Sequence, residues 1–89
     1  MVFEDEYLSP AESMFLAGCD DLTLRRHAAK GKLKFYMTPG GTRRYARSGI
    51  VDMGKRRGRL RVRTLDDGSR ELWVFKDGRA SMSLGSADL

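Results

Sequence analysis

The chain has 89 residues, 40% of which are hydrophobic, and it carries 17 Lys or Arg against 12 Asp or Glu. This length predicts one small domain with a modest core, and the apolar share is too high for a disordered chain. No apolar run reaches the roughly 18 residues of a membrane span and the acidic start is unlike a secretory signal, so we expect a cytoplasmic protein without a membrane partner.

Cysteine and histidine are scarce. Cys19 and His27 are the only residues of their types, so no internal disulfide can form and a zinc site lacks the further ligands that it needs. No nucleophile–base pair, paired carboxylates or phosphate-cradling loop stands out either. The sequence therefore predicts a protein that is not an enzyme and that needs no metal or other cofactor.

The positive charge is concentrated in the middle of the chain. Residues 1–21 carry six acidic side chains and no Lys or Arg, whereas residues 22–63 carry 14 Lys or Arg and one acid, Asp52. Residues 64–89 carry three basic and five acidic side chains. Such a basic block is typical of a protein that binds a polyanion such as nucleic acid. The alternative is a solvated basic surface that only promotes solubility.

A first helix is predicted over residues 10–17. Ser9 can cap it, Pro10 suits the first helical position because an N–H is not needed there, and Glu12 completes a capping box with Ser9. Gly18 is expected to end the helix. The apolar face predicted from helical spacing consists of Ala11, Met14, Phe15 and Gly18.

A second helix is predicted directly afterwards, over residues 21–30. Asp20 can cap it, and Gly31 is a typical residue just past a helix end. Two helices joined by a short turn that contains Gly predict a helix-turn-helix. The side chains expected to face the core are Leu24, Ala28 and Leu33, and those expected on the exposed side are Thr23, Arg26, His27 and Lys30, with Arg25 at the flank.

A β-hairpin and a short helix are predicted next. Residues 33–37 and 43–45 are expected to form two strands around a turn at residues 38–42, and this hairpin is the predicted wing. Ser48 is expected to cap a short helix over residues 49–53.

The last third of the chain is predicted to be rich in strands. After a basic hinge at residues 54–58, Arg and apolar residues alternate over residues 59–64, and an Asp-Asp-Gly turn leads to an apolar strand at residues 71–75. A third strand is expected at residues 79–84 and a frayed tail at residues 85–89.

The central region carries a set of local motifs. They are Leu8-Ser9-Pro10-Ala11-Glu12, Gly18, Thr23-Leu24-Arg25-Arg26, Lys30-Gly31-Lys32-Leu33 and Thr38-Pro39-Gly40-Gly41-Thr42-Arg43-Arg44-Tyr45, with Ser48 following. This set resembles the MerR-like helix-turn-helix family, which includes phage and plasmid excisionases and small actinobacterial regulators. The similarity covers residues 8–53 without a gap, and its last motif is the most specific part.

The resemblance implies a role for each matching position. The second helix would enter the major groove of DNA, where Thr23, Arg25 and Arg26 match positions that contact bases or phosphates. The wing, with Arg43 and Arg44, would lie along the backbone or in the adjacent minor groove, whose negative potential attracts Arg. The full set of predicted DNA-binding residues is Thr23, Arg25, Arg26, His27, Lys30, Thr42, Arg43 and Arg44.

Several positions depart from the family pattern. His27 stands where the family usually has Trp or another large residue, and Thr42 stands where it often has His. Ser13 and Ala17 are smaller than the apolar residues common at those positions. Full MerR regulators continue into a long dimerising helix and an effector domain, whereas residues 59–84 are predicted to be strands. The usual grounds for an effector-sensing dimer are therefore missing.

The fold predicted for the whole chain is α+β, a winged helix-turn-helix with a C-terminal β-hairpin or three-stranded meander. An acidic N-terminal arm at residues 1–7 is expected to precede the winged helix-turn-helix DNA-binding domain at residues 8–54. The basic hinge, the β-hairpin extension and the frayed tail make up residues 55–89.

Two features of the last third each have two interpretations. Trp73 and Phe75 either cover the apolar face of the hairpin or contact another protein. A row of basic residues either contacts an extra length of phosphate backbone or protects an exposed strand edge from aggregation. The members of this row are Arg56, Arg57, Arg59, Arg61 and Arg63.

The sequence thus predicts a sequence-specific protein that binds double-stranded DNA. It is expected to act either as an excisionase-like recombination directionality factor, with an integrase as partner, or as a small transcriptional regulator that contacts the transcription machinery. Cooperative self-association on DNA is compatible with both uses. The alternative is a protein-interaction module in which the winged fold and the C-terminal strands bind a protein partner.

Overall fold

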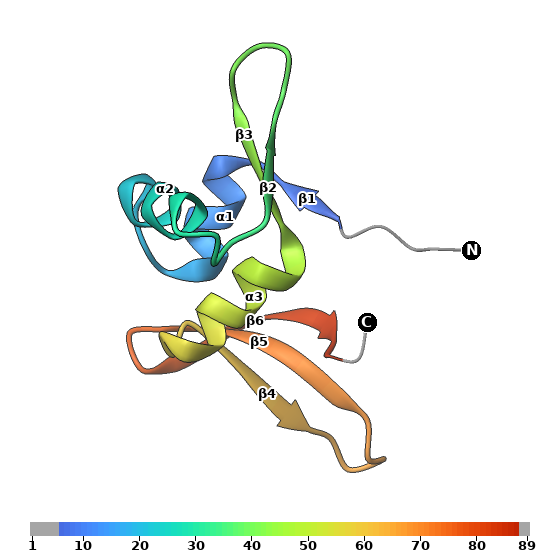
Figure 1. Cartoon of the computed structure of the whole chain (residues 1–89). Coiled ribbons are helices and arrows are strands. Elements are labelled where there is room, and N and C mark those ends of the chain that lie inside the picture. The colour runs from blue at the N-terminus through green and yellow to red at the C-terminus, as the bar shows by residue number, and fades with distance from the viewer. Residues whose placement is uncertain (1–5, 88–89) are drawn as a thin grey trace, which may run out of the picture.

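A computed structural model of the chain describes residues 6–87. This part of the chain forms a small α+β domain with three helices and two antiparallel three-stranded sheets (Figure 1). Its elements are β1 (Tyr7–Leu8), α1 (Pro10–Ala17), α2 (Asp21–Ala29), β2 (Phe35–Met37), β3 (Arg43–Ala46), α3 (Arg47–Arg56), β4 (Leu60–Thr64), β5 (Arg70–Lys76) and β6 (Arg79–Ser86). None of the helices in residues 6–87 is both long and apolar enough to cross a membrane.

Helix α1 begins and ends where its local sequence predicts. The backbone N–H of Glu12 donates to the Ser9 hydroxyl over 3.2 Å, and the Glu12 carboxylate accepts from both the hydroxyl and the backbone N–H of Ser9. Gly18 follows in the left-handed conformation at φ 71°, and its N–H donates to the Met14 carbonyl. A capping box and a C-terminal glycine therefore set the two ends of this helix.

The buried face of α1 differs from the predicted one. Ser13 and Ala17 are fully buried, whereas Ala11 is exposed and the Phe15 side chain is 43% exposed. The prediction was wrong because α1 packs against α3 at close range, and only small side chains fit there. The Ser13 hydroxyl donates to the Ser9 carbonyl over 2.7 Å, so its burial leaves no unpaired donor.

Helix α2 is capped by Asp20 and turns its apolar side inward. Leu24 and Ala28 are buried, as predicted, and Leu33 joins the same core from beyond the helix. The strand predicted to start at Leu33 starts two residues later, at Phe35, because Leu33 is used for this packing rather than for strand pairing.

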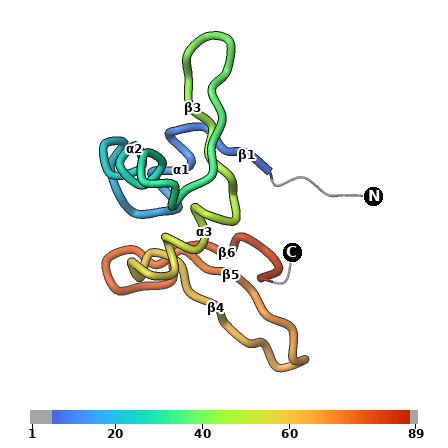
Figure 2. Tube along the Cα trace, in the orientation of Figure 1, coloured from blue at the N-terminus to red at the C-terminus, as the bar shows by residue number. Residues whose placement is uncertain are grey.

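The first sheet has the strand order β1-β3-β2, with β3 in the middle. In the hairpin, Phe35 is opposite Tyr45, Tyr36 is opposite Arg44 and Met37 is opposite Arg43. The hairpin β2–β3 projects away from the helices at one end of the molecule (Figures 1 and 2). Residues 1–5 of the predicted acidic arm lie outside the described residues, but Tyr7 of that arm pairs with Ala46 as part of β1.

Helix α3 is longer than predicted and starts earlier. It directly continues β3, with Ala46 in the cap position and no side-chain cap hydrogen bond, so Ser48 already lies in the first turn and is not the cap. The helix continues to Arg56, and Gly54 is buried inside it. Residues 54–56 of the predicted hinge are therefore part of α3, because tertiary packing of this helix outweighs the low helix propensity of Gly, and only residues 57–58 lie outside it.

The second sheet is the three-stranded meander predicted from the alternating pattern, in the order β4-β5-β6. Leu60 is opposite Val74, and Val62 is opposite Leu72. Strand β6 runs to Ser86, so the predicted fraying from residue 85 does not occur at that residue. Positions 88–89 of the predicted tail lie outside the described residues.

Two hydrophobic clusters hold these elements together. The first lies between the three helices and β1 and β3, and Tyr45 and Ile50 are fully buried in it. The second lies between α3 and the second sheet. Leu16 packs against both clusters. The result is an extended molecule of 45 × 38 × 21 Å with the hairpins β2–β3 and β4–β5 at opposite ends (Figure 2).

Candidate nucleic-acid interface

Helix α2 presents one side to solvent next to the projecting hairpin. The turn Gly18-Cys19-Asp20 joins it to α1, and Leu24 and Ala28 anchor its inner side. Arg26 and Lys30 are exposed on its outer side, one helical turn apart. At about 1.5 Å per residue, its nine residues span roughly 13 Å, which suits a stretch of DNA major groove.

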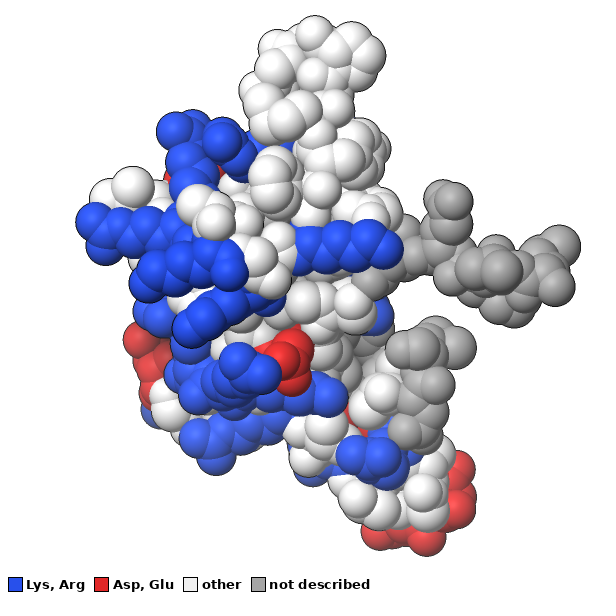
Figure 3. Space-filling view, viewed as in Figure 1, with Lys and Arg blue, Asp and Glu red and all other residues white. Residues whose placement is uncertain are grey.

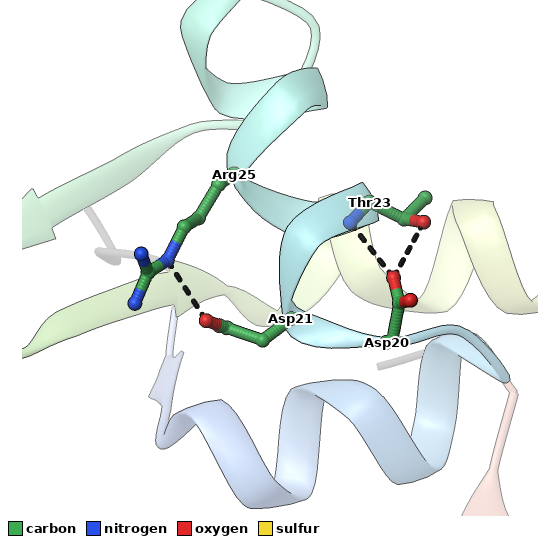
Figure 4. Close-up of polar contacts among 4 residues, drawn as sticks. All are labelled: Asp20, Asp21, Thr23 and Arg25. Atoms are coloured by element: carbon green, nitrogen blue, oxygen red, sulfur yellow. Dashed lines mark hydrogen bonds and ion pairs between the residues drawn. The ribbon is translucent and has the colours of Figure 1, made fainter.

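The start of α2 is held by Asp20 and Thr23 (Figure 4). Asp20 Oδ1 accepts from the Thr23 backbone N–H over 2.9 Å and from the Thr23 hydroxyl over 2.7 Å. These hydrogen bonds lower the pKa of the Asp20 carboxyl. The Thr23 hydroxyl proton is thus used by the cap, which leaves the methyl group and the oxygen lone pairs of Thr23 for a ligand.

Arg25 and Arg26 are neighbours in the chain but differ in their surroundings. Arg25 Nε lies 2.8 Å from Asp21 Oδ2, in an ion pair between residues four apart (Figure 4). Arg26 has no ion pair within residues 6–87 and points from the exposed side of the helix. Arg26 is therefore the guanidinium of α2 that is ready to bind an external acceptor, whereas Arg25 already has one.

His27 and Lys30 occupy the last turn of α2. His27 is half-buried and its carbonyl accepts the Lys32 N–H over 2.9 Å. Lys30 is the exposed C-cap residue, and its N–H donates to the Arg26 carbonyl. The half-buried position of His27 fits a side chain that packs along the helix, and the exposed Lys30 ammonium is available to an anion.

Arg43 and Arg44 point to opposite faces of the hairpin because successive side chains of a strand alternate. The Arg43 guanidinium lies 5.7 Å from the centroid of the Phe35 ring, on the face that carries Tyr45. Arg44 lies opposite Tyr36 on the other face, where Tyr36 contacts the Tyr7 ring. The sequence pattern treats these two arginines as one pair, but they lie on the two opposite faces of the hairpin.

The projecting end of the hairpin carries no charge (Figure 3). The Thr42 N–H donates to the Thr38 hydroxyl over 3.1 Å, and the Thr38 N–H donates to the Thr42 carbonyl over 2.8 Å. Gly41 adopts φ 86°, a conformation that favours glycine in such a turn. The turn is thus closed by its own hydrogen bonds, and the hairpin's basic residues, Arg43 and Arg44, follow this turn directly in β3.

A groove of about 380 Å³ lies between α1, the start of α2 and the hairpin. It brings together three of the predicted DNA-binding residues, Arg25, Thr42 and Arg43, although they come from two separate segments. The other five predicted residues do not line it. Pro10 and Met14 of α1 also line this groove. The sequence pattern did not indicate their contribution, because no local signal shows which part of α1 faces the hairpin.

Lysine and arginine side chains gather on one side of the molecule, over α2 and on toward the second sheet (Figure 3). Cys19, in the turn between α1 and α2, has a half-buried thiol, and burial raises the pKa of this thiol. Among residues 6–87, no group of three or more His, Cys, Asp or Glu residues could hold a metal ion. Cations and hydrogen-bond donors on this side are suited to an anionic partner.

Comparison with known proteins finds no matching family model, no matching curated protein and no matching solved structure.

Proposed function

We propose that this protein binds double-stranded DNA as a winged helix-turn-helix, with α2 in the major groove and the hairpin β2–β3 as the wing in the adjacent minor groove. The observation that carries the proposal is the exposed outer side of α2 beside a projecting hairpin that has Arg43 and Arg44 next to its turn. This side of α2 carries Lys30 and Arg26, which has no ion pair within the described residues. The basic charge on this side complements phosphate, and the dimensions of α2 suit a major groove.

The environment of each residue suggests its role on DNA. Arg26 reads a base edge, because its guanidinium is exposed and not engaged in an ion pair within the described residues. Lys30 neutralises a DNA phosphate, and Arg25 is oriented toward the DNA backbone while it keeps its ion pair with Asp21. Thr23 and His27 contribute van der Waals contacts, and Thr42 with the two wing arginines follows the minor groove.

Two uses of this DNA-binding mode follow from the resemblance to excisionases and small regulators. In recombination, several copies would bind clustered sites cooperatively, bend the DNA and favour excision by an integrase. In transcription, the protein would bind promoter sites and contact the transcription machinery. Both uses are binding functions without a catalytic step in this chain.

The proposal is tested by selecting bound duplexes from a random DNA pool at physiological salt with a non-specific competitor. We expect one enriched sequence, and Arg26→Ala should weaken binding to it by about 1–3 kcal/mol while relaxing the preference at one base pair. Arg25→Ala is the matched control on the same helix, and it should reduce affinity less and leave the preferred sequence unchanged. Equal selection by the wild type and Arg26→Ala would contradict the base-reading role.

A protein-interaction module is the second candidate function. It is favoured by the apolar side chains that strand β2 exposes, since Tyr36 and Met37 are about half exposed on the hairpin. Salt separates the two functions, because each phosphate contact on duplex DNA contributes about −0.9 to the slope of log affinity against log salt concentration. A protein partner would give a shallow slope and would lose affinity on substitution of Tyr36 or Met37.

A further inference from the structure

The outer face of the second sheet carries a row of arginines stacked on aromatic rings. The Arg59 guanidinium lies 5.7 Å from the centroid of the Phe15 ring, Arg61 lies 4.7 Å from that of Phe75, and Arg63 lies 5.0 Å from that of Trp73. Alternation along β4 places Arg61 and Arg63 on one face, opposite the side on which Leu60 and Val62 pack into the core. Arg59 directly precedes β4 and lies at the end of this row, against Phe15 of α1.

Stacking holds these guanidinium groups in place without neutralising their charge. A ring below a guanidinium attracts the cation and restricts its rotamers, while the N–H groups around its edge stay available to acceptors. Arg61 and Arg63 are exposed, and Glu71, the carboxylate opposite Arg63 in the register, accepts from the Trp73 indole N–H over 3.1 Å. The row is therefore a set of preorganised cationic donors.

A groove of about 360 Å³ lies at the start of this row and reaches the turn between α1 and α2. Arg57, Arg59, Arg61 and Lys76 line it, and Asp77 is the acidic residue in its wall.

The Arg57 Nε donates to the Gly18 carbonyl over 3.2 Å, so this arginine ties the groove directly to the turn before α2. A Cβ at Gly18 would come within 3.0 Å of the Arg59 Cβ, which shows how closely the row abuts the helices. The basic surface continues from α2 to the second sheet on the same side of the molecule (Figure 3).

The arrangement favours a contact to phosphate over protection of a strand edge. Here the guanidinium groups lie across the sheet, over rings of the neighbouring strand β5 and of α1. That geometry presents them together to a ligand in front of the sheet.

We infer that a second DNA-contacting surface consists of this face of the second sheet, with Arg61 and Arg63, and of the adjoining groove, which Arg57, Arg59 and Lys76 also line. It binds the phosphate backbone of the duplex beside the site occupied by α2. This inference rests on the proposed function and extends it, because it lengthens the bound DNA beyond the reach of one helix and one hairpin. Contacts to phosphate add affinity and register but no sequence preference.

The experiment measures the affinity of the full chain for its selected duplex over a range of salt concentrations. The variant Arg61→Gln with Arg63→Gln removes two cationic groups, and we expect the log–log slope to become shallower by about 1.8, the value for two phosphate contacts. The enriched sequence should stay the same, and hydroxyl-radical protection should shrink at one flank only. Arg61→Lys with Arg63→Lys should keep most of the slope, because it keeps the charge.

Lys55→Gln is the control, compared with Arg61→Gln as a single substitution that removes one positive charge. Lys55 is exposed on α3 and lines a different groove, with Leu72 and Ser86. Its loss should change the slope less than the loss of Arg61. Circular dichroism melting of every variant shows whether the fold is kept.

Each other outcome overturns a different statement. An unchanged slope and footprint in the double Gln variant, with wild-type binding intact, would contradict the second surface and leave the role of α2 standing. Equal effects of Lys55→Gln and Arg61→Gln would mean diffuse charge rather than a surface. A loss restricted to single-stranded oligonucleotides would make the face a base-stacking platform. Absence of duplex binding by the wild type would remove the proposed function itself.

Discussion

Arg25 and Arg26 illustrate how much the surroundings of a residue decide its use. Both extend from α2, but the first is paired with Asp21 at 2.8 Å, whereas the second is exposed and has no such pair within residues 6–87. An exposed ion pair between residues four apart is worth only a few tenths of a kcal/mol, about 0.3–0.5 kcal/mol, so it biases the orientation of Arg25 without locking it. We therefore propose that Arg26 reads a base and that Arg25 is oriented toward the DNA backbone.

Tyr45, unlike these exposed arginines, is fully buried in the first cluster together with its polar hydroxyl group. Its hydroxyl has no hydrogen-bond partner within the described residues, and burial raises its pKa. A buried unsatisfied polar group costs about 1–3 kcal/mol. Such a hydroxyl therefore lowers the stability of the fold, while the packed ring of Tyr45 contributes to it.

We expect Tyr45→Phe to leave the free energy of unfolding unchanged or to raise it by about 1 kcal/mol, because it removes the unpaired hydroxyl and keeps the packed ring. Urea unfolding of the wild type and the variant measures this difference, provided that the unfolding free energy of both depends on urea concentration with the same slope. A loss of more than about 1 kcal/mol would show that the hydroxyl does form a hydrogen bond in solution.

At the scale of elements, α3 connects the two halves of the molecule. It follows β3 without a loop, packs against α1 on one side and leads into β4 on the other. At Gly54 of α3, an added Cβ would overlap the Leu16 backbone oxygen and come within 2.7 Å of the Leu60 side chain. The close approach of α1, α3 and β4 thus depends on the absence of a side chain at this position.

We expect Gly54→Ala to lower the free energy of unfolding by about 1–3 kcal/mol, in spite of the better helix propensity of Ala, because a backbone oxygen cannot move aside as a side chain can. Gly49→Ala in the same helix is the control. There the nearest atom is the Leu33 Cδ1, the end of a flexible side chain, so the effect should be much smaller. Equal midpoints in urea for the two variants would contradict this account of α3.

At the scale of the whole molecule, we expect the first hydrophobic cluster to form without the second sheet. The first cluster is built from residues of the helices and the first sheet, and the second sheet adds cover to Leu16 and Val51 from outside. The hairpin β2–β3 and the hairpin β4–β5 extend in opposite directions from this shared middle (Figure 1). The region proposed to read DNA therefore has a core of its own.

We expect a chain ended after Arg57 to keep a cooperative unfolding transition and to lose about 1–3 kcal/mol of stability, since two partly covered apolar side chains become exposed. Circular dichroism during thermal unfolding measures this. The fragment should still bind duplex DNA, with a shallower salt dependence. A fragment without any cooperative transition would show that the first cluster needs the second sheet.

The sequence by itself determined the features that depend on near neighbours in the chain. The capping box at Ser9 and the cap at Asp20 start α1 and α2, and Gly18 and Gly31 follow their ends. The alternation over residues 59–64 likewise predicted β4 correctly. These signals act through hydrogen bonds and backbone preferences between residues a few positions apart, so a linear pattern contains them.

Only the tertiary structure decided which side of an element is buried and what it meets. Small Ser13 is buried on α1 while Phe15 lies outside under Arg59, because the close approach of α3 selects for size rather than for hydrophobicity. The same packing extends α3 through Gly54. Tertiary packing also places Arg25 and Arg43 in one groove, and Arg57 at the Gly18 carbonyl, across long stretches of chain. Such contacts depend on how the elements pack together in space, and local sequence patterns do not contain that information.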